Sequence, residues 1–375
     1  MNVALRVLLL VTLLLPGLAM AAPNDAVRAF PPSWWVGMKN PDLQLLVSGP
    51  GIGADALTVE MPEGVVRIGD RALASPNYRV VDLRIDAAAK TGDIVLRFSG
   101  RNGERRVLVP LATRRAGSAE REGFGPKDAI LNLMPDRFAN GDPSNDRVPG
   151  MLEAAEPGNG AARQGGDIAG LVNSLDYIAG MGFTMVWPTP VLENNQPAYS
   201  YHGYAITDLY RVDPRFGSNE AYRDFVAQAR AKGIGVIQDI VPNHIGHHHP
   251  WANDPPTPTW ISNGNRFIET QHGRTAVTDP YAPKVDIENF QHGWFHPTMP
   301  DLDQRDPILA RYLEQNAIWW IEYADLAGLR VDTYGYSDTA FLQGWIAAIL
   351  REYPRFTIVG EEWSANPAVV AHWQQ

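Results

Sequence analysis

The segment GIGVIQDIVPNH (233–244) decides the fold class, because an apolar run of strand length ends abruptly in polar residues. Similar apolar runs occur at 128–135 (DAILNLMP), 183–190 (FTMVWPTP), 328–336 (GLRVDTYGY) and 356–363 (FTIVGEEW). A helical period fills most of the intervals between them, at 167–182, 218–233, 307–324 and 338–353. Repeated strand-then-helix units predict a parallel sheet, either doubly wound or closed into a barrel.

The residues before this part have a different texture. Residues 28–114 contain short alternating runs such as ALTVEM and DIVLRFSG, separated by turn-rich spacers such as KTGD, which predicts a small β-sandwich. Residues 115–127 are polar and charged and are interpreted as a linker to the part that spans 128–375. Residues 245–306 interrupt the strand–helix alternation without clear helices, so we expect a functional loop or a subdomain there.

The N-terminus is typical of a secretory signal peptide. Arg6 precedes the apolar run VLLLVTLLLPGLA, and Ala19-Met20-Ala21 fits a cleavage site, so residues 1–21 are predicted to direct export. An uncleaved anchor is the alternative. The 375 residues contain no cysteine, so the protein would work in an oxidising compartment, the periplasm, without a disulfide.

Composition excludes some partners. The formal net charge of −10 argues against capture of nucleic acid or of an acidic membrane surface. The 11 Trp and 13 Tyr residues suit either sugar stacking or an aromatic core.

Carboxylates collect where the predicted strands end. The third strand delivers Asp239, the fourth Asp332, and the fifth Glu361 followed by Glu362. A buried carboxylate is costly unless it is paired, so either a buried ion-pair cluster around Arg330 or a catalytic site explains the pattern. One ionised and one protonated carboxyl group serve glycoside hydrolysis. We expect Arg330 to keep Asp332 ionised, and Glu361 to be protonated in a drier wall, with Glu362 on the opposite face.

These motifs, DIVPNH, GLRVDTY and GEEW in this order, resemble regions I, II and III of the α-amylase family, glycoside hydrolase family 13. MPDLDQ (299–304) resembles a further motif of the cyclomaltodextrinase and neopullulanase group, with Asp303 in place of the usual Asn. PPSWWVGM, near the N-terminus, is similar to the domain that precedes the barrel in periplasmic cyclomaltodextrinases.

The resemblance implies an N-terminal immunoglobulin-like β-sandwich followed by a (β/α)8 TIM barrel. Residues 128–375 would hold this barrel through about its fifth strand, with 245–306 as the subdomain after strand 3. The family's next motif, which carries a third acid, is not found before Gln375. We therefore expect a C-terminally truncated chain that is inactive alone.

The resemblance also implies residue roles. Asp332 matches the nucleophile, Glu361 the general acid/base and Arg330 the residue that supports the nucleophile. Asp239, Tyr204 and His244 match residues that contact the sugar or flank the nucleophile, although Tyr204 could be a core residue and His244 an ordinary loop histidine. The implied activity is retaining hydrolysis of α-1,4 bonds in cyclodextrins, maltodextrins or pullulan. A glucanotransferase, a trehalose-forming enzyme and a non-catalytic glucan-binding protein are the alternatives.

A second cluster, DRFANGDPSND followed by QGGD, is rich in oxygen donors. Such ligands in an irregular loop suit Ca²⁺, although the same residue types also form ordinary turns. The resemblance to neopullulanase-type enzymes favours calcium, with the ligands Asn140, Asp142, Asn145, Asp146, Gly165 and Asp167. The run His247-His248-His249 is interpreted as a solvated loop rather than a metal site.

The N-terminal part also offers a candidate interaction surface. Trp34 and Trp35 are either a sugar platform or buried interface aromatics, and we expect a homodimer through this part as one possible assembly.

Overall fold

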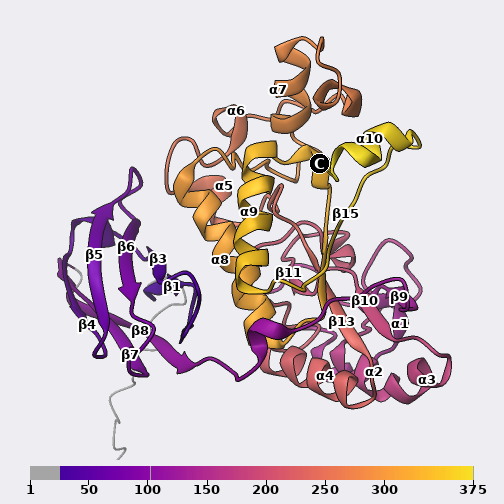
Figure 1. Ribbon diagram of the computed structural model, residues 1–375, viewed down its shortest axis with the longest axis horizontal. Coiled ribbons are helices and arrows are strands. Elements are labelled where there is room, and N and C mark those ends of the chain that lie inside the picture. Colours follow the sequence, from indigo (N-terminus) through magenta and orange to yellow (C-terminus); the bar gives the residue numbers. More distant parts are fainter. Residues whose placement is uncertain (1–25, 102, 375) are drawn as a thin grey trace, which may run out of the picture.

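The computed structural model of the protein describes residues 26–101 and 103–374. The predicted signal peptide, residues 1–21, lies outside the described residues. Among the residues described, none of the helices combines the length and the apolar character that crossing a bilayer requires. Figure 1 shows an N-terminal unit of strands beside a larger unit of strands and helices.

The N-terminal unit consists of two four-stranded sheets, ordered β1-β3-β6-β5 and β2-β8-β7-β4. Alternating apolar residues form its strands, so that Val81, Leu96 and Phe98 are buried in the core. Trp34 is also buried, which excludes it as an exposed sugar platform. The strands are β1 (Arg28–Phe30), β2 (Trp34–Val36), β3 (Asp42–Ser48), β4 (Ala56–Glu60), β5 (Val65–Ala72), β6 (Tyr78–Ile85), β7 (Gly92–Gly100) and β8 (Gly103–Thr113).

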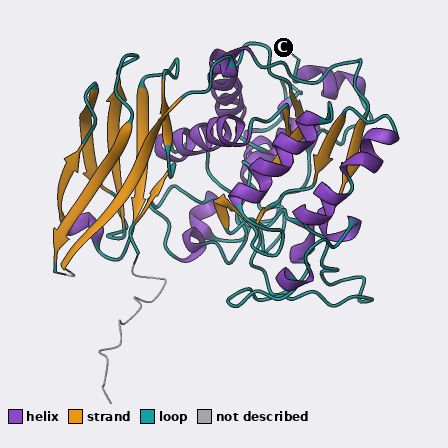
Figure 2. Cartoon of the chain, turned by 90° about the horizontal axis from the view of Figure 1, so that it is seen from below, coloured by secondary structure: helices purple, strands orange, loops and turns teal. Residues whose placement is uncertain are grey.

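The larger unit is built on a five-stranded sheet ordered β15-β14-β13-β10-β9, in which every neighbouring pair is parallel. The prediction of a parallel sheet is therefore confirmed. Its strands are β9 (Ile130–Leu133), β10 (Met185–Pro188), β13 (Gly235–Ile240), β14 (Gly328–Val331) and β15 (Ile358–Gly360). The connecting helices include α2 (Ile168–Asn173), α3 (Leu175–Gly180), α4 (Asn219–Ala231), α8 (Pro307–Ala324) and α9 (Thr339–Glu352). Figure 2 shows helices around these strands.

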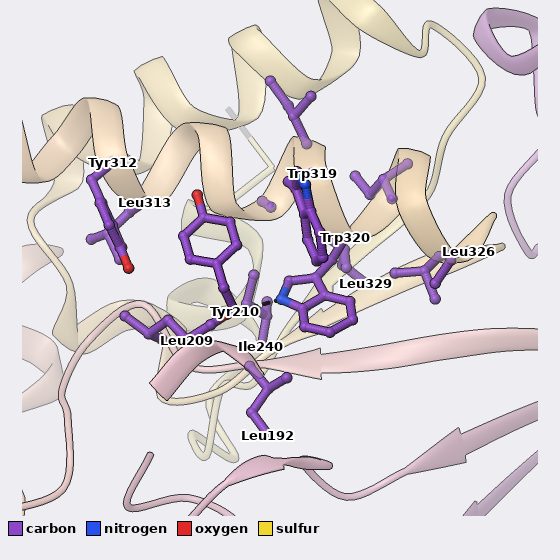
Figure 3. Close-up of a cluster of buried hydrophobic side chains, with 14 of the residues drawn as sticks. Leu192, Leu209, Tyr210, Ile240, Tyr312, Leu313, Trp319, Trp320, Leu326 and Leu329 are labelled. Atoms are coloured by element: carbon purple, nitrogen blue, oxygen red, sulfur yellow. Dashed lines mark hydrogen bonds between the residues drawn. The ribbon is translucent and has the colours of Figure 1, made fainter. Parts of the chain in front are cut away.

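Helix α8 carries much of the core of this unit. It begins at an Asp306 cap followed by Pro307, a residue that suits the first helical turn, and it ends where Asp325 adopts a φ of 61°. Its apolar face buries Trp319 and Trp320, and the indole N–H of Trp320 donates to the Leu209 carbonyl at 2.9 Å. Figure 3 shows these indoles between the helix and the strands beneath it.

The structure differs from the sequence prediction at three places. The segment 245–306 does contain helices, α5 (Pro250–Asn253), α6 (Ser262–Asn265) and α7 (Lys284–His292), too short for a clear periodic signal. A hairpin of β11 (Leu192–Glu193) and β12 (Asp208–Val212), which was not predicted, precedes α4. Strand β14 ends at Val331 and a 3-10 turn follows at Tyr334–Tyr336, where a longer strand was expected, because Thr333 turns the backbone with a φ of 44°.

The two units meet through buried acids of the helices. Glu352, at the end of α9, accepts hydrogen bonds from the backbone amides of Lys39 and Asn40 at 3.0 and 2.7 Å. The carboxylate of Glu352 also lies 3.0 Å from Nη1 of Arg114. The N-terminal unit is thereby fixed against α9 at a point that is closed to solvent.

A second buried acid lies beside the first. Glu322 of α8 is 3.3 Å from Arg114 and 3.4 Å from Arg121, and it accepts a hydrogen bond of 2.9 Å from the hydroxyl of Tyr353. We call Glu322 and Glu352 the interface acid pair. These two buried acids and two arginines form one network, at whose edge the partly exposed Asp325 lies 3.5 Å from Arg121.

Candidate active site

Three carboxylates and one arginine come together at the ends of the central strands. Nη1 of Arg330 lies 2.8 Å from Oδ1 of Asp239 and 2.8 Å from Oδ1 of Asp332, while Nη2 lies 2.5 Å from Oε1 of Glu361. We call Asp239, Asp332 and Glu361 the carboxylate cluster. Both Asp332 and Glu361 contact the same guanidinium, so their carboxyl groups face a common space.

The parallel register of the sheet produces this arrangement. Asp239 is paired with Arg330 across β13 and β14, and Arg330 with Val359 across β14 and β15. Just beyond the strands, the Asp332 amide donates to the Ile240 carbonyl and the Glu361 amide donates to the Val331 carbonyl, each at 2.9 Å. Because the carboxyl ends of parallel strands share one edge, residues about 90 positions apart become neighbours.

The solvent exposure of the two catalytic candidates differs from the expectation. The side chain of Asp332 is 8% exposed and that of Glu361 24%, so the nucleophile candidate has the drier environment. Burial, together with the nearby Asp239 and Glu361 carboxylates, raises the pKa of Asp332 to about 8 despite the contact with Arg330. Burial likewise raises the pKa of Asp239 to about 6. The direction of this pKa shift is opposite to the expectation that Arg330 keeps Asp332 ionised, because burial and two neighbouring carboxylates oppose the single guanidinium.

Aromatic residues line the same space. The hydroxyl of Tyr204 donates to Oδ2 of Asp239 at 3.1 Å, and the indole N–H of Trp187 donates to the same oxygen at 3.0 Å. The Arg330 guanidinium stands over both rings, 5.3 Å from the Trp187 centroid and 5.7 Å from that of Tyr204. Trp187 was missed by the sequence reasoning, although an indole at the end of the second predicted strand was a usable signal.

His244 lies next to this wall. Its Nε2 is 3.1 Å from the carbonyl oxygen of Tyr204, and its ring stacks on Phe295 at a centroid distance of 6.3 Å. Burial lowers the pKa of His244 to about 4, so the imidazole is neutral at pH 7 and donates one N–H to its partner. The structure therefore brings the candidates Tyr204, His244 and Asp239 to the carboxylate cluster.

Glu361 and Glu362 diverge from the end of β15. Glu361 accepts a hydrogen bond of 2.9 Å from the amide of Thr333, whereas Glu362 accepts one of 3.0 Å from the indole of Trp373. Only Glu361 contacts Arg330. The adjacent acids thus point to different surroundings, as strand alternation predicts.

The candidate calcium loop is organised around Asp167. Its carboxylate accepts hydrogen bonds from the amides of Gly141 and Asp142 at 3.0 and 2.8 Å and from the side chain of Asn145 at 3.0 Å. It also caps helix α2 through the amide of Gly170. Asp167 therefore links the loop 140–146 to the start of α2.

The remaining donors of this loop lie close to one another. The side-chain Nδ2 of Asn140 donates to Oδ1 of Asp146 at 2.9 Å. Gly165 has a φ of 89°, and a Cβ at that position would stand 2.3 Å from Oδ1 of Asp146, so only glycine permits this approach. Oδ1 of Asn145 is buried without a hydrogen-bond partner. An unpaired oxygen among hard donors fits a calcium ion.

His247, His248 and His249 do not form a shared metal site. Nδ1 of His249 accepts the amide of Trp251 and caps α5, while the rings of His247 and His248 meet edge to face. Across the described ranges, no group of three or more His, Asp or Glu side chains is arranged to hold a metal ion.

Comparison with known proteins agrees with this architecture. The family description "Alpha amylase, catalytic domain" matches residues 132–375, and "Cyclomaltodextrinase, N-terminal" matches residues 28–115. A beta/alpha-amylase of Paenibacillus polymyxa is 33% identical over 66% of this chain and 19% of its own length. A cyclomaltodextrinase of Geobacillus thermopakistaniensis (strain MAS1) is 31% identical over 63% of this chain and 39% of its own length. The chain thus spans less than half of either relative.

A solved structure is also similar to this chain. The crystal structure of an alpha-amylase from Geobacillus thermoleovorans, complexed with acarbose, is 33% identical to this chain with a TM-score of 0.53. The match covers 66% of this chain and 49% of the other. Since the catalytic-domain match takes in well over half of the residues and includes the whole carboxylate cluster, the chain belongs to the alpha-amylase family.

Proposed function

We propose that the protein is a retaining α-glucan hydrolase that cleaves α-1,4 bonds of cyclodextrins, maltodextrins or pullulan. The observation that carries this proposal is the placement of Asp332 and Glu361 on two nitrogens of one guanidinium, at the ends of adjacent parallel strands. When two carboxyl groups face one space, one can attack the anomeric carbon of a glycosidic bond while the other protonates the bridging oxygen.

In the first step, a carboxylate oxygen of Asp332 attacks the anomeric carbon and forms a glycosyl ester. The bond from that carbon to the bridging oxygen breaks, and Glu361 gives its proton to this oxygen, which leaves as a sugar hydroxyl. Neutral His244 and the hydroxyl of Tyr204 flank the site as groups able to hydrogen-bond the sugar.

In the second step, ionised Glu361 accepts a proton from water, whose oxygen attacks the anomeric carbon. The ester bond breaks, Asp332 leaves as a carboxylate, and Glu361 is protonated again. Burial raises the pKa of Asp332, so this carboxyl group must give up its proton before it can attack the substrate.

The test, made on the intact protein with its barrel complete, is the configuration of the first product released from maltotriose or a cyclodextrin, followed by proton NMR. Retention predicts that the α-anomer appears first, and release of the β-anomer would overturn the mechanism. Products longer than the substrate would instead indicate a glucanotransferase, and trehalose would indicate a trehalose-forming enzyme. Binding without turnover that Asp332→Asn leaves unchanged would indicate a glucan-binding protein.

We further propose that Ca²⁺ binds at Asn140, Asp142, Asn145, Asp146, Asp167 and the carbonyl of Gly165. The unpaired Oδ1 of Asn145 and the glycine-only approach at Gly165 support this proposal. The ion would hold the loop 140–146 against α2. Titration of chelator-treated protein with calcium should raise the melting temperature, and Asn145→Ala should abolish that rise; an unchanged melting temperature would contradict the site.

The finer description of the fold is also a proposal. We propose that residues 28–114 form an immunoglobulin-like sandwich and that the five-stranded parallel sheet is the first part of a (β/α)8 barrel. The two four-stranded sheets and the parallel strand order support this assignment. Residues 115–127 would then be the linker, with Arg121 of this segment packed against Glu322 of α8.

Export and assembly are proposals that the sequence supports. We propose that residues 1–21 are removed during export to the periplasm, which N-terminal sequencing of the mature protein would test. A homodimer through the N-terminal unit is proposed because the edge strand β5 exposes Val66 and Ile68. Sedimentation of the wild-type protein and of Ile68→Glu would test it, and a monomer at high concentration would contradict it.

A further inference from the structure

The segment 245–306 reaches back to the loops that follow both catalytic candidates. One loop, Tyr334–Tyr336, follows Asp332, and the other, beginning at Glu361, follows β15. Between α6 and α7, Arg274 contacts both of these loops and His272 contacts the first.

The first contact is made to Tyr336. Nη2 of Arg274 donates to the hydroxyl of Tyr336 at 3.2 Å, and Nδ1 of His272 is 2.9 Å from the same oxygen. Tyr336 is buried, and its amide donates to the carbonyl of Thr333 at 3.0 Å. Thr333 in turn donates its amide to Glu361 at 2.9 Å. The hydroxyl that Arg274 binds therefore belongs to the same short turn that holds the Glu361 carboxylate.

The second contact is made to the residues after Glu361. The Arg274 guanidinium stands 4.9 Å from the ring centroid of Trp363, and its Nε lies 3.7 Å from the carboxylate of Glu362. Nε of Arg274 has no hydrogen-bond partner although it is buried, so this side of the guanidinium is held by charge and by the ring. Arg274 thus touches the chain on both sides of the acid/base candidate.

The backbone of the segment is shaped for this double contact. His272 has a φ of 56°, in the left-handed region that non-glycine residues rarely adopt. This conformation brings the side chains of His272 and Arg274 to one tyrosine hydroxyl. Backbone strain of this kind persists where the surrounding structure requires it.

From these contacts we propose that Arg274 is a positioning residue, which holds the loops after Asp332 and Glu361 in fixed relative position and so orients Glu361 toward the leaving oxygen. This inference rests on the proposed function. It assigns to the segment 245–306 a role in catalysis that does not require it to touch the reacting atoms.

The test compares two substrates that need different amounts of proton donation. When maltotriose is cleaved, the leaving sugar departs as a hydroxyl group and needs a proton from Glu361. An aryl α-maltoside releases a nitrophenolate, which needs little proton donation. We expect Arg274→Ala to lower kcat/KM for maltotriose about 10- to 100-fold, since small misplacement of a catalytic group is that costly. For the aryl maltoside the loss should stay within about 3-fold, because the nitrophenolate departs with little help from the acid.

Three further variants separate positioning from folding. Arg274→Lys should restore part of the maltotriose activity through its charge, and Tyr336→Phe, which removes only the hydroxyl, should give a smaller loss with the same substrate preference. Arg266→Ala is the matched control, because Arg266 lies in the same segment, is exposed and binds only the nearby carbonyl of Asn263. It should leave both activities unchanged.

The outcomes are distinct. An equal loss on both substrates, or a lower melting temperature with unchanged kcat/KM, would overturn the positioning role. Intact wild-type protein, with its barrel complete, that hydrolyses neither substrate would instead overturn the proposed function, and the positioning role of Arg274 with it.

Discussion

The molecule contains two buried acidic groups of residues that differ in charge balance. At the interface between the units, Glu322 and Glu352 share Arg114 and Arg121. At the ends of the strands, the carboxylate cluster of three acids shares only Arg330. Paired buried charges are typical of structural networks, whereas an excess of one sign raises pKa values and is typical of catalytic sites. The comparison teaches that the number of arginines per acid, more than burial alone, separates the two roles.

The largest effect is expected from a change in the carboxylate cluster. Asp332→Asn removes the proposed nucleophile with little change of shape, so kcat/KM on maltotriose should fall by roughly 10⁴-fold, as for other essential nucleophiles. Steady-state kinetics with circular dichroism to confirm folding would measure it. A variant that keeps a tenth of the activity would show that Asp332 is not the nucleophile.

The interface acid pair should respond through stability instead. Glu322→Gln removes the buried carboxylate that Arg114 and Arg121 share, so the free energy of unfolding should drop by about 3 kcal/mol, the usual cost of breaking a buried pair. Urea unfolding would measure the change. The matched control is Glu122→Gln, because Glu122 pairs with Arg355 at the surface and such pairs contribute about 0.5 kcal/mol or less. Equal effects from the two variants would remove the distinction between buried and exposed pairs.

The pH dependence of stability provides the third test. The pKa of Asp332 is raised from 3.8 to about 8 by burial, so between these values the folded protein binds a proton that the unfolded chain has lost. The stability contributed by this proton is complete below pH 4 and is lost as pH rises toward 8. Asp332→Asn abolishes this loss, and the variant should be more stable than wild type at pH 8 by roughly 1–3 kcal/mol. Thermal unfolding at pH 5 and pH 8 would detect it; a variant that is less stable at pH 8 would contradict the raised pKa.

The smallest effect is expected at a half-exposed ion pair. Arg28 of the N-terminal unit lies 2.6 Å from Asp208 of β12, but its side chain is 51% exposed and is screened by solvent. Arg28→Ala should lower the free energy of unfolding by no more than about 1 kcal/mol. A loss as large as that of Glu322→Gln would mean that exposure is a poor guide to the strength of these contacts.

The sequence predicted the strands of the parallel sheet better than their ends. All five predicted segments contain the observed strands, because long apolar runs bounded by turns leave few alternatives. Strand β14 was predicted to end several residues further along the chain than it does. The sequence VDTYGY does not indicate that Thr333 adopts a left-handed backbone conformation. Helix α7 was missed because nine residues carry little periodicity.

The site followed from strand order, but its protonation did not. Asp239, Arg330, Asp332 and Glu361 meet because the carboxyl ends of parallel strands share an edge, which the sequence pattern already indicated. The side chain of Asp332 is less exposed than that of Glu361 because of how the loops pack, and the pattern of apolar residues in the sequence does not predict this packing. Trp187 and Arg274 were overlooked for a related reason, since both contribute through contacts with residues far away in the chain.

The contact of Glu352 with the amides of Lys39 and Asn40 has a consequence for synthesis of the protein. These partners are separated by more than 300 positions, so the N-terminal unit leaves the ribosome long before α9 exists. Domains commonly fold in the order in which they are made. Until α9 is made, the amides of Lys39 and Asn40 lack the Glu352 carboxylate and are exposed to water. Contacts of Arg28 with Asp208 and of Arg114 with Glu322 can form before α9 is made, so α9 adds the last of these contacts between the units.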